Sequence, residues 1–224
     1  MIARSSRPAG RHRPRKLRSR QVRLGVLGGS FNPPHIGHLV IASDAFESLQ
    51  LDKLIVVPAA LNPLKQHEKG APTPQQRLEM AGMTFGGDLR FEVSAMEIER
   101  GGLSYTVDTL EALAAENPDA DIVLLLGVDA VESLDRWRKP ERIRELASLA
   151  MLSRGDDDGE VPEGVKRVTT RRIDVSSTEI RERLGKGLPI RGFVAESVER
   201  FISAAKLYGS PAEAGPGERG NGNA

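Results

Sequence analysis

Two histidines of this chain stand three residues apart behind a glycine-rich turn. Residues 28–39 read GGSFNPPHIGHL and follow directly on an apolar run over residues 22–27, in a chain with only four histidines. A spacing of three places His35 and His38 on one face of the helix that the next residues predict, at its first turn. Helix N-termini attract anions, and each imidazole can donate from a ring N–H. The pair is therefore suited to holding phosphate oxygens while charge moves during a transfer.

The residues around the pair leave other interpretations open. Gly28 and Gly29 would allow positive φ and a close approach of the backbone to a phosphate. Alternatively, Pro33 and Pro34 start the helix and the histidines are ordinary surface residues. A zinc site is disfavoured because no HExxH segment and no cysteine accompany the two histidines. Neither a GxxxxGK[ST] nor a GxGxxG turn follows the apolar run, which argues against a P-loop or an NAD-type site.

Short apolar runs alternate with helical patterns along the chain. Strands are predicted over residues 23–29, 53–58, 89–94, 122–126, 149–152 and 166–170, and helices over residues 36–49, 75–83, 106–115, 178–184 and 196–207. Buried strands joined by helices predict a doubly wound α/β fold with a parallel sheet covered on both faces. Ligands bind beyond the carboxyl ends of such strands, where residues 28–38, 62–65 and 127–129 would lie.

The length and composition of the chain limit the classes of protein to which it can belong. The chain has 224 residues and no cysteine, which fits one domain and excludes disulfides and thiolate chemistry. No apolar run approaches the roughly 20 residues needed to span a bilayer, and no apolar signal segment begins the chain. We therefore expect a soluble, cytoplasmic protein with no membrane partner, and a homo-oligomer is compatible with the sequence.

The two ends differ in character from the rest. Residues 1–20 hold eight of the 32 Lys and Arg and none of the 31 Asp and Glu, so a basic arm precedes an acidic body. Such an arm can bind nucleic acid or resemble a transit peptide, but it has no interleaved aromatics for base stacking, and we expect it to be incidental and disordered. The Gly- and Pro-rich residues 209–224 are expected to be disordered as well. Residues 21–208 form the expected domain.

GGSFNPPHIGHL resembles the opening motif of the HxGH nucleotidyltransferases, which have a Rossmann-like fold. With later segments in the same order, the chain is similar to the nicotinic acid mononucleotide adenylyltransferases between about residues 23 and 208. These segments are NPLK at 62–65, EIERGGLSYTVDTL at 97–110, LGVD at 126–129, Trp137 and SSTEIR at 176–181. The HxGH core alone is moderately specific, whereas the ordered set is strongly so.

The resemblance implies a reaction. Nicotinic acid mononucleotide would attack the α-phosphorus of ATP through its phosphate, giving deamido-NAD and pyrophosphate for NAD biosynthesis, with Mg²⁺ carried by the triphosphate. No covalent enzyme intermediate is implied. The residues agree, because transfer of this kind needs positioning and charge stabilisation, and no nucleophile with its own base is visible in the sequence.

The resemblance also assigns residues to ATP. The loop from Gly28 through Gly29, Ser30 and Phe31 would approach the nucleotide, and His35 and His38 would contact its phosphates. Hydroxyls and N–H groups at a helix start would meet the triphosphate at Ser176 and Ser177, with Arg181 neutralising charge. Ser176 and Glu179 equally form a helix capping box. Gly127 and Asp129 would contact the adenosine ribose, although an Asp after a strand is also an ordinary helix cap.

The mononucleotide side is implied by a second set. Its pyridine ring would stack on Trp137, and its carboxylate would meet N–H groups around Ser104, Tyr105 and Thr106 at a helix start. Core packing is the alternative for this lone tryptophan. Asn32, Asn62 and Lys65 complete the set of residues that the resemblance implies for mononucleotide binding. Because NPLK departs from the commoner NPPHK-like spelling, Lys65, Lys69 or neither would contact the phosphate.

Other functions share part of this pattern. Pantetheine-phosphate adenylyltransferases have the HxGH and serine-rich motifs but would not need the SYT segment and Trp137. Nicotinamide mononucleotide differs from the acid at a single atom, and recognition by backbone N–H groups favours the acid. A non-catalytic nucleotide sensor would not require His35, His38 and Arg181 together.

Overall fold

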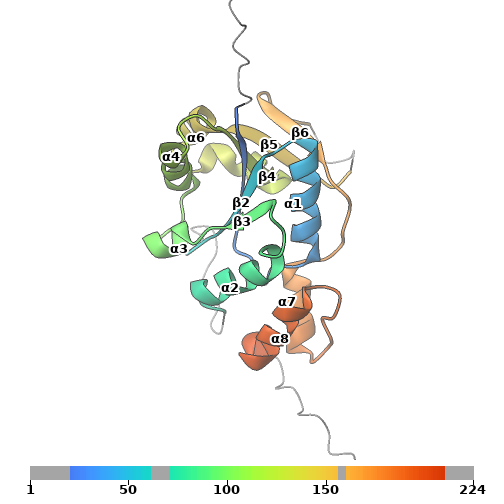
Figure 1. Ribbon diagram of the computed structural model, residues 1–224. Coiled ribbons are helices and arrows are strands. Elements are labelled where there is room, and N and C mark those ends of the chain that lie inside the picture. Colours follow the sequence, from blue (N-terminus) through green and yellow to red (C-terminus); the bar gives the residue numbers. More distant parts are fainter. Residues whose placement is uncertain (1–20, 62–70, 156–159, 210–224) are drawn as a thin grey trace, which may run out of the picture.

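A six-stranded parallel sheet forms the centre of the molecule, as the sequence predicts (Figure 1). The computed structural model describes residues 21–61, 71–155 and 160–209. The strands are β1 (Arg23–Gly29), β2 (Lys53–Pro58), β3 (Phe91–Val93), β4 (Asp121–Gly127), β5 (Ser148–Ser153) and β6 (Val165–Thr169). They pair in the order β3-β2-β1-β4-β5-β6, which is the doubly wound order of nucleotide-binding sheets.

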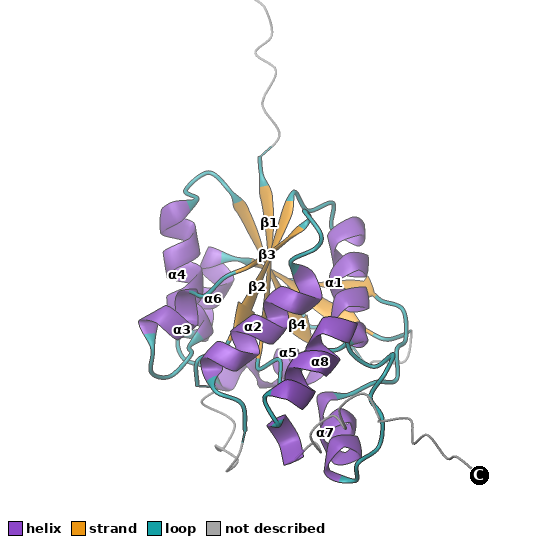
Figure 2. Cartoon of the chain, turned by 60° about the horizontal axis from the view of Figure 1, so that its bottom comes forward, coloured by secondary structure: helices purple, strands orange, loops and turns teal. Residues whose placement is uncertain are grey.

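Helices cover both faces of this sheet (Figure 2). Those that the sequence predicts are α1 (Ile36–Ser48), α2 (Pro74–Phe85), α4 (Thr106–Glu116), α7 (Ser177–Gly185) and α8 (Glu196–Ala204). Short helices that it missed are α3 (Met96–Arg100), α5 (Val128–Ser133) and α6 (Pro140–Leu146), with 3-10 turns η1 (Leu134–Arg136) and η2 (Leu207–Gly209). The last predicted helix is too long, because Lys206 and Tyr208 take left-handed φ values of 51° and 58°.

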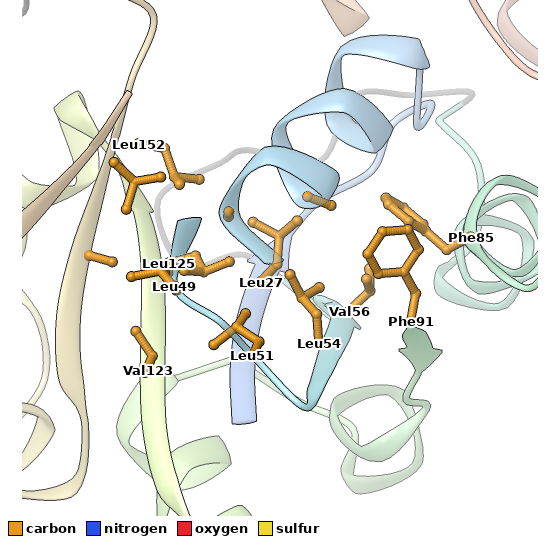
Figure 3. Close-up of a cluster of buried hydrophobic side chains, with 14 of the residues drawn as sticks. Leu27, Leu49, Leu51, Leu54, Val56, Phe85, Phe91, Val123, Leu125 and Leu152 are labelled. Atoms are coloured by element: carbon orange, nitrogen blue, oxygen red, sulfur yellow. The ribbon is translucent and has the colours of Figure 1, made fainter. Parts of the chain in front are cut away.

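Alternate residues of each strand face two separate cores. Val26 of β1 points into the core beneath α4, α5 and α6, whereas its neighbour Leu27 points into the core beneath α1 and α2. Figure 3 shows the second of these, where Leu27, Leu49 and Phe85 pack with side chains from β2, β4 and β5. Burial on both faces is the reason why the strands read as continuous apolar runs.

A third apolar cluster fixes the C-terminal helices. Met80 of α2 packs with Ile180 of α7, with Val198 and Ile202 of α8, and with Leu207. Since α2 also packs on the sheet, this cluster holds α7 near the loop that follows β1.

The strand order reverses between β1 and β4. These two neighbours pair in parallel, with Leu27 opposite Leu125, so their carboxyl ends lie side by side. Helices leave them toward opposite faces of the sheet, and in open α/β sheets this switch point is where ligands bind. We call the region beside the carboxyl ends of β1 and β4 the crevice. None of the helices in the three described ranges is long and apolar enough to cross a membrane. The expectations for residues 1–20 and for most of residues 209–224 lie outside the described residues, which end at Gly209.

Candidate functional site

The loop after β1 turns differently from the sequence-based expectation. Gly28 and Gly29 end the strand without positive φ; the left-handed residue is Phe31, with φ 46°, followed by a cis peptide bond between Asn32 and Pro33. Phe31 can hold this conformation because its ring is buried in the core under α1 and α2. A Cβ on Gly28 would meet nothing within 4 Å, so the strand end faces open space. Close approach of a ligand, rather than backbone conformation, is what this glycine permits.

The two histidines meet at the start of α1, as their spacing predicts. His35 is the N-cap and His38 lies in the first turn, with ring centroids 3.8 Å apart. The backbone N–H of His35 donates to Nδ1 of His38 at 3.2 Å. In the neutral ring, that bond leaves the proton on Nε2 of His38, which is then a donor. The prolines precede the N-cap and do not form the first helical turn, because the helix begins at Ile36.

His35 is buried and uncharged at neutral pH. The residue is only 5% exposed, and its Nδ1 has no hydrogen-bond partner in the described part of the chain. Burial, and to a lesser degree the positive charge of Arg154, lowers the pKa of His35 to about 4. The hydroxyl of Ser30 is likewise buried without a partner in the described ranges. Buried polar atoms without a partner are uncommon in proteins, and these two lie at the loop after β1 and at the helix start that follows it.

The start of α7 lies against the same loop. The Ser177 hydroxyl donates to the Pro33 carbonyl at 2.8 Å, and the Arg181 guanidinium donates to the Asn32 carbonyl at 3.0 Å. Ser176 is the N-cap, as predicted, and its hydroxyl accepts from the Glu179 N–H at 3.1 Å; of the predicted capping box, this is the half that the structure shows. The fold therefore brings together two motifs that are about 140 residues apart in the sequence.

The end of β4 supplies the other side of the crevice. Gly127 is the N-cap of α5, and Asp129 is an exposed carboxylate in the first turn of that helix. Asp129 is not the cap, so this alternative from the sequence is wrong. A Cβ on Gly127 would also meet nothing within 4 Å. Each of the two strands at the switch point thus has a glycine with open space beside it near its carboxyl end, Gly28 in β1 and Gly127 in β4.

Residues 104–106 lie at the carboxyl end of β2. The Ser104 hydroxyl accepts from the Ala60 N–H at 2.8 Å, and the Ser104 N–H donates to the Leu61 carbonyl at 2.9 Å. Tyr105 is the N-cap of α4 and Thr106 is its first residue, as the sequence predicts. Tyr105 provides no side-chain cap, and the Asp108 N–H donates to the Tyr105 carbonyl at 3.1 Å, so the N–H groups of Thr106 and Val107 are the ones that could meet an anion.

Trp137 is connected to the start of α4 by the next residue in the chain, Arg138. Arg138 places its guanidinium 4.6 Å from the centre of the Tyr105 ring and 3.5 Å from the Asp108 carboxylate. Trp137 itself is only partly buried; it packs at the edge of the core and donates from Nε1 to the Ser133 hydroxyl at 3.2 Å. Its environment accommodates both packing and an accessible aromatic surface. Asn62, Lys65 and Lys69 lie outside the described residues.

Sequence reasoning missed three residues of this region. Arg77, on the buried face of α2, donates to the carbonyls of Ser30 and Ala60, each at 2.8 Å. The Tyr208 hydroxyl donates to Oδ1 of Asn32 at 2.7 Å, and burial raises the pKa of Tyr208. Arg154 acts on His35 through its charge. Only Arg77 left a signal, because it stands in helical register with the apolar residues Met80, Ala81 and Phe85.

Titratable side chains do not gather into an evident metal site. Within the described ranges, no group of three or more His, Cys, Asp or Glu side chains is placed to hold a metal ion. The chemistry visible at the crevice is instead that of an anion site: N–H groups at two helix starts, two imidazoles and the Arg181 guanidinium.

Known proteins are similar to this chain over most of its length. The cytidylyltransferase-like family model matches residues 26–183. A probable nicotinate-nucleotide adenylyltransferase of Gemmatimonas aurantiaca is 44% identical over 198 residues, a match that covers 84% of this chain and 92% of that one. Its counterpart in Geobacillus kaustophilus is 37% identical over 188 residues, covering 84% and 87%. The nicotinic acid mononucleotide adenylyltransferase of Plasmodium falciparum, solved with NaAD, has a similar fold: TM-score 0.68, 17% identity, and coverage of 86% and 100%.

Proposed function

The chain belongs to the cytidylyltransferase-like family and, within it, to the nicotinate-nucleotide adenylyltransferases, and we propose that it transfers AMP from ATP to nicotinic acid mononucleotide. The observation that carries the chemistry is the packed pair His35 and His38 at the N-terminus of α1, at the switch point of the sheet. The products are deamido-NAD and pyrophosphate, which places the reaction in NAD biosynthesis.

ATP occupies the crevice between β1 and β4. Its α- and β-phosphates lie by the His35 and His38 rings, and the N–H groups and hydroxyls at Ser176 and Ser177 receive the rest of the triphosphate. Arg181 offsets its negative charge. The strand ends at Gly28 and Gly127 leave space for the nucleoside, whose ribose hydroxyls donate to the Asp129 carboxylate. Mg²⁺ enters as part of the substrate, bound to the triphosphate.

The mononucleotide lies along the carboxyl end of β2. The N–H groups at the start of α4, around Tyr105 and Thr106, bind the pyridine carboxylate, and Ser104 orients this turn through its bond to Ala60. Trp137 offers a π-face to the ring. Because backbone N–H groups can only donate, they suit a carboxylate better than a carboxamide, which presents an N–H₂ group of its own.

The reaction is a single displacement. A phosphate oxygen of the mononucleotide attacks the α-phosphorus, a new P–O bond forms, and the bond from the α-phosphorus to the bridging oxygen of the β-phosphate breaks. Pyrophosphate leaves with the electron pair of that bond. Charge accumulates on the oxygens around the α-phosphorus and on the leaving group, where N–H donors of His38 and Arg181 stabilise it. No side chain needs to take a proton, because the attacking phosphate is already ionised.

The experiment that tests this function follows both products. The full chain is incubated with ATP, Mg²⁺ and nicotinic acid mononucleotide, and deamido-NAD and pyrophosphate are quantified in parallel. We expect equal amounts of the two, and no pyrophosphate when the mononucleotide is omitted. Pyrophosphate release without an acceptor, or no product at all, would contradict the proposal, the second result favouring a nucleotide sensor.

A further inference from the structure

Arg77 is a buried cation that the proposed mechanism does not use. The residue is 7% exposed, and no carboxylate among the described residues lies within ion-pair distance of its guanidinium. Burial lowers the pKa of Arg77. A charge in such a place is costly unless hydrogen bonds compensate for the water that it loses. The hydrogen bonds that Arg77 makes must therefore account for its burial.

Its two terminal nitrogens hold the carboxyl ends of two neighbouring strands. One donates to the carbonyl of Ser30, which follows β1, and the other donates to the buried carbonyl of Ala60, which follows β2; both distances are 2.8 Å. The planar fork of a guanidinium allows both bonds at once, whereas the ammonium of a lysine is a single point.

The connection continues to the start of α4. The N–H of Ala60 donates to the Ser104 hydroxyl, the N–H of Ser104 donates to the carbonyl of Leu61, and Leu61 pairs with Leu103 in a parallel bridge. A continuous chain of hydrogen bonds thus runs from Ser30 through Arg77 to Ser104. One end lies in the proposed ATP loop and the other in the proposed mononucleotide turn.

We propose that Arg77 is a positioning residue that couples the two substrate sites. This inference rests on the proposed function, because it takes the two ends of the bridge to bind different substrates. A substrate that fixes the Ser30 loop fixes Arg77, then Ala60 and the Ser104 turn, so that the second substrate meets a site already ordered. Either substrate then increases the affinity for the other, by the same factor in both directions.

The test measures that factor directly. Nicotinic acid mononucleotide is titrated into the protein with and without saturating Mg²⁺ and α,β-methylene-ATP, which binds but cannot transfer AMP, and the reverse titration is run as well. For the unaltered chain we expect a ratio of dissociation constants of about 5 or more, in the range usual for coupled sites. For Arg77→Lys and Arg77→Met we expect a ratio close to one.

A matched variant separates coupling from stability. Arg23 lies at the amino end of β1, away from Arg77. It also joins two elements, because it bonds to the Asp121 carboxylate of β4 at 2.8 Å and to the Leu49 carbonyl after α1. Arg23→Lys should lower the melting temperature as Arg77→Lys does and yet keep the coupling ratio of the unaltered chain. A ratio of one in the unaltered chain, or an unchanged ratio in the Arg77 variants, would overturn the proposal.

A kinetic cycle decides the case where the variants bind too weakly for titration. If Arg77 and Ser104 act as one bridge, the double variant Arg77→Lys with Ser104→Ala loses no more kcat/KM than the more damaging single variant. Losses that multiply would show that the two residues act separately, and the bridge would be wrong. Failure of the proposed function is distinguishable, because the unaltered chain would then form no deamido-NAD at all.

Discussion

At residue 35 the chain buries an imidazole at a helix N-cap, a position that serine, threonine or aspartate usually occupies. His35 stays neutral there, and its backbone N–H sets the tautomer of His38. The two rings therefore have different tasks. The backbone N–H of His35 orients the His38 ring, and the proposed function assigns the Nε2–H donor of His38 to the phosphates.

Replacing His38 tests the donor. We expect His38→Ala to lower kcat by a factor on the order of 10² or more, because a donor aimed at developing charge is lost. Steady-state kinetics with both substrates saturating measures this, and thermal unfolding verifies that the variant is folded. A near-normal kcat in a folded variant would remove His38 from the phosphate site.

The buried His35 predicts a pH-dependent stability. Its pKa is about 4 in the folded chain against 6.5 when unfolded, so below pH 6.5 the unfolded state binds a proton that the folded state does not. Stability contributed by this group is therefore lost as pH falls from about 6.5 to 4, by about 3 kcal/mol in all. Urea unfolding at pH 7 and pH 4.5 should show a smaller loss for His35→Gln than for the unaltered chain. Equal losses would mean that the ring is already hydrated.

At the scale of elements, the proposed recognition of both substrates rests on the N-termini of helices. The N-termini of α1, α4 and α7 all lie at the carboxyl edge of the sheet, and the N-terminus of a helix favours an anion. Three such ends fit a pair of substrates that carry phosphates and a carboxylate. The segment after α5 adds Trp137, which joins Phe31 and Tyr105 as an aromatic side chain of the implied set.

That segment gives a prediction for Trp137. We expect Trp137→Ala to raise KM for nicotinic acid mononucleotide by about tenfold, the value of a lost aromatic contact of roughly 1.5 kcal/mol, and to leave KM for ATP nearly unchanged. Trp137→Phe, which keeps a ring, should recover part of the loss. If KM for both substrates rises equally and the melting temperature falls, Trp137 is a packing residue.

The elements also show what the sequence could and could not predict. Strands β1, β2, β4 and β5 were visible because residues such as Leu54 to Val57 are buried on both faces and read as one apolar run, whereas β3 and β6, at the edges of the sheet, are less buried and gave weaker patterns. Helices α3, α5 and α6 were missed because five to seven residues carry too little periodicity. Phe31 takes the left-handed turn that the neighbouring glycines suggested, since burial of its ring decides the conformation. The bridge through Arg77 depends on tertiary contacts and left only the register of α2 as a signal.

For the whole molecule, the doubly wound order explains why distant motifs form one site. The strand order reverses between β1 and β4, and the cluster around Met80 holds α7, whose first residues bond to the loop after β1. Residues 21–209 thus contain the sheet, all three apolar clusters and every described residue of the site.

A truncation tests whether this part suffices. We expect removal of residues 1–20 to leave kcat and both KM values within about twofold, because the contacts that hold the β1 loop, the histidines and α7 together are made within residues 30–208. The melting temperature should be unchanged as well. Loss of turnover or of folding in the truncated chain would show that the basic arm is part of the enzyme.

The most direct measurement compares acceptors. Pyrophosphate release from ATP and Mg²⁺ is followed with nicotinic acid mononucleotide, nicotinamide mononucleotide and phosphopantetheine side by side, and kcat/KM is obtained for each. We predict the highest value for nicotinic acid mononucleotide, with the amide at least about tenfold lower because helix-start N–H groups cannot pair with its N–H₂ group. A higher kcat/KM for either other acceptor would keep the roles of the histidines and contradict the assigned substrate.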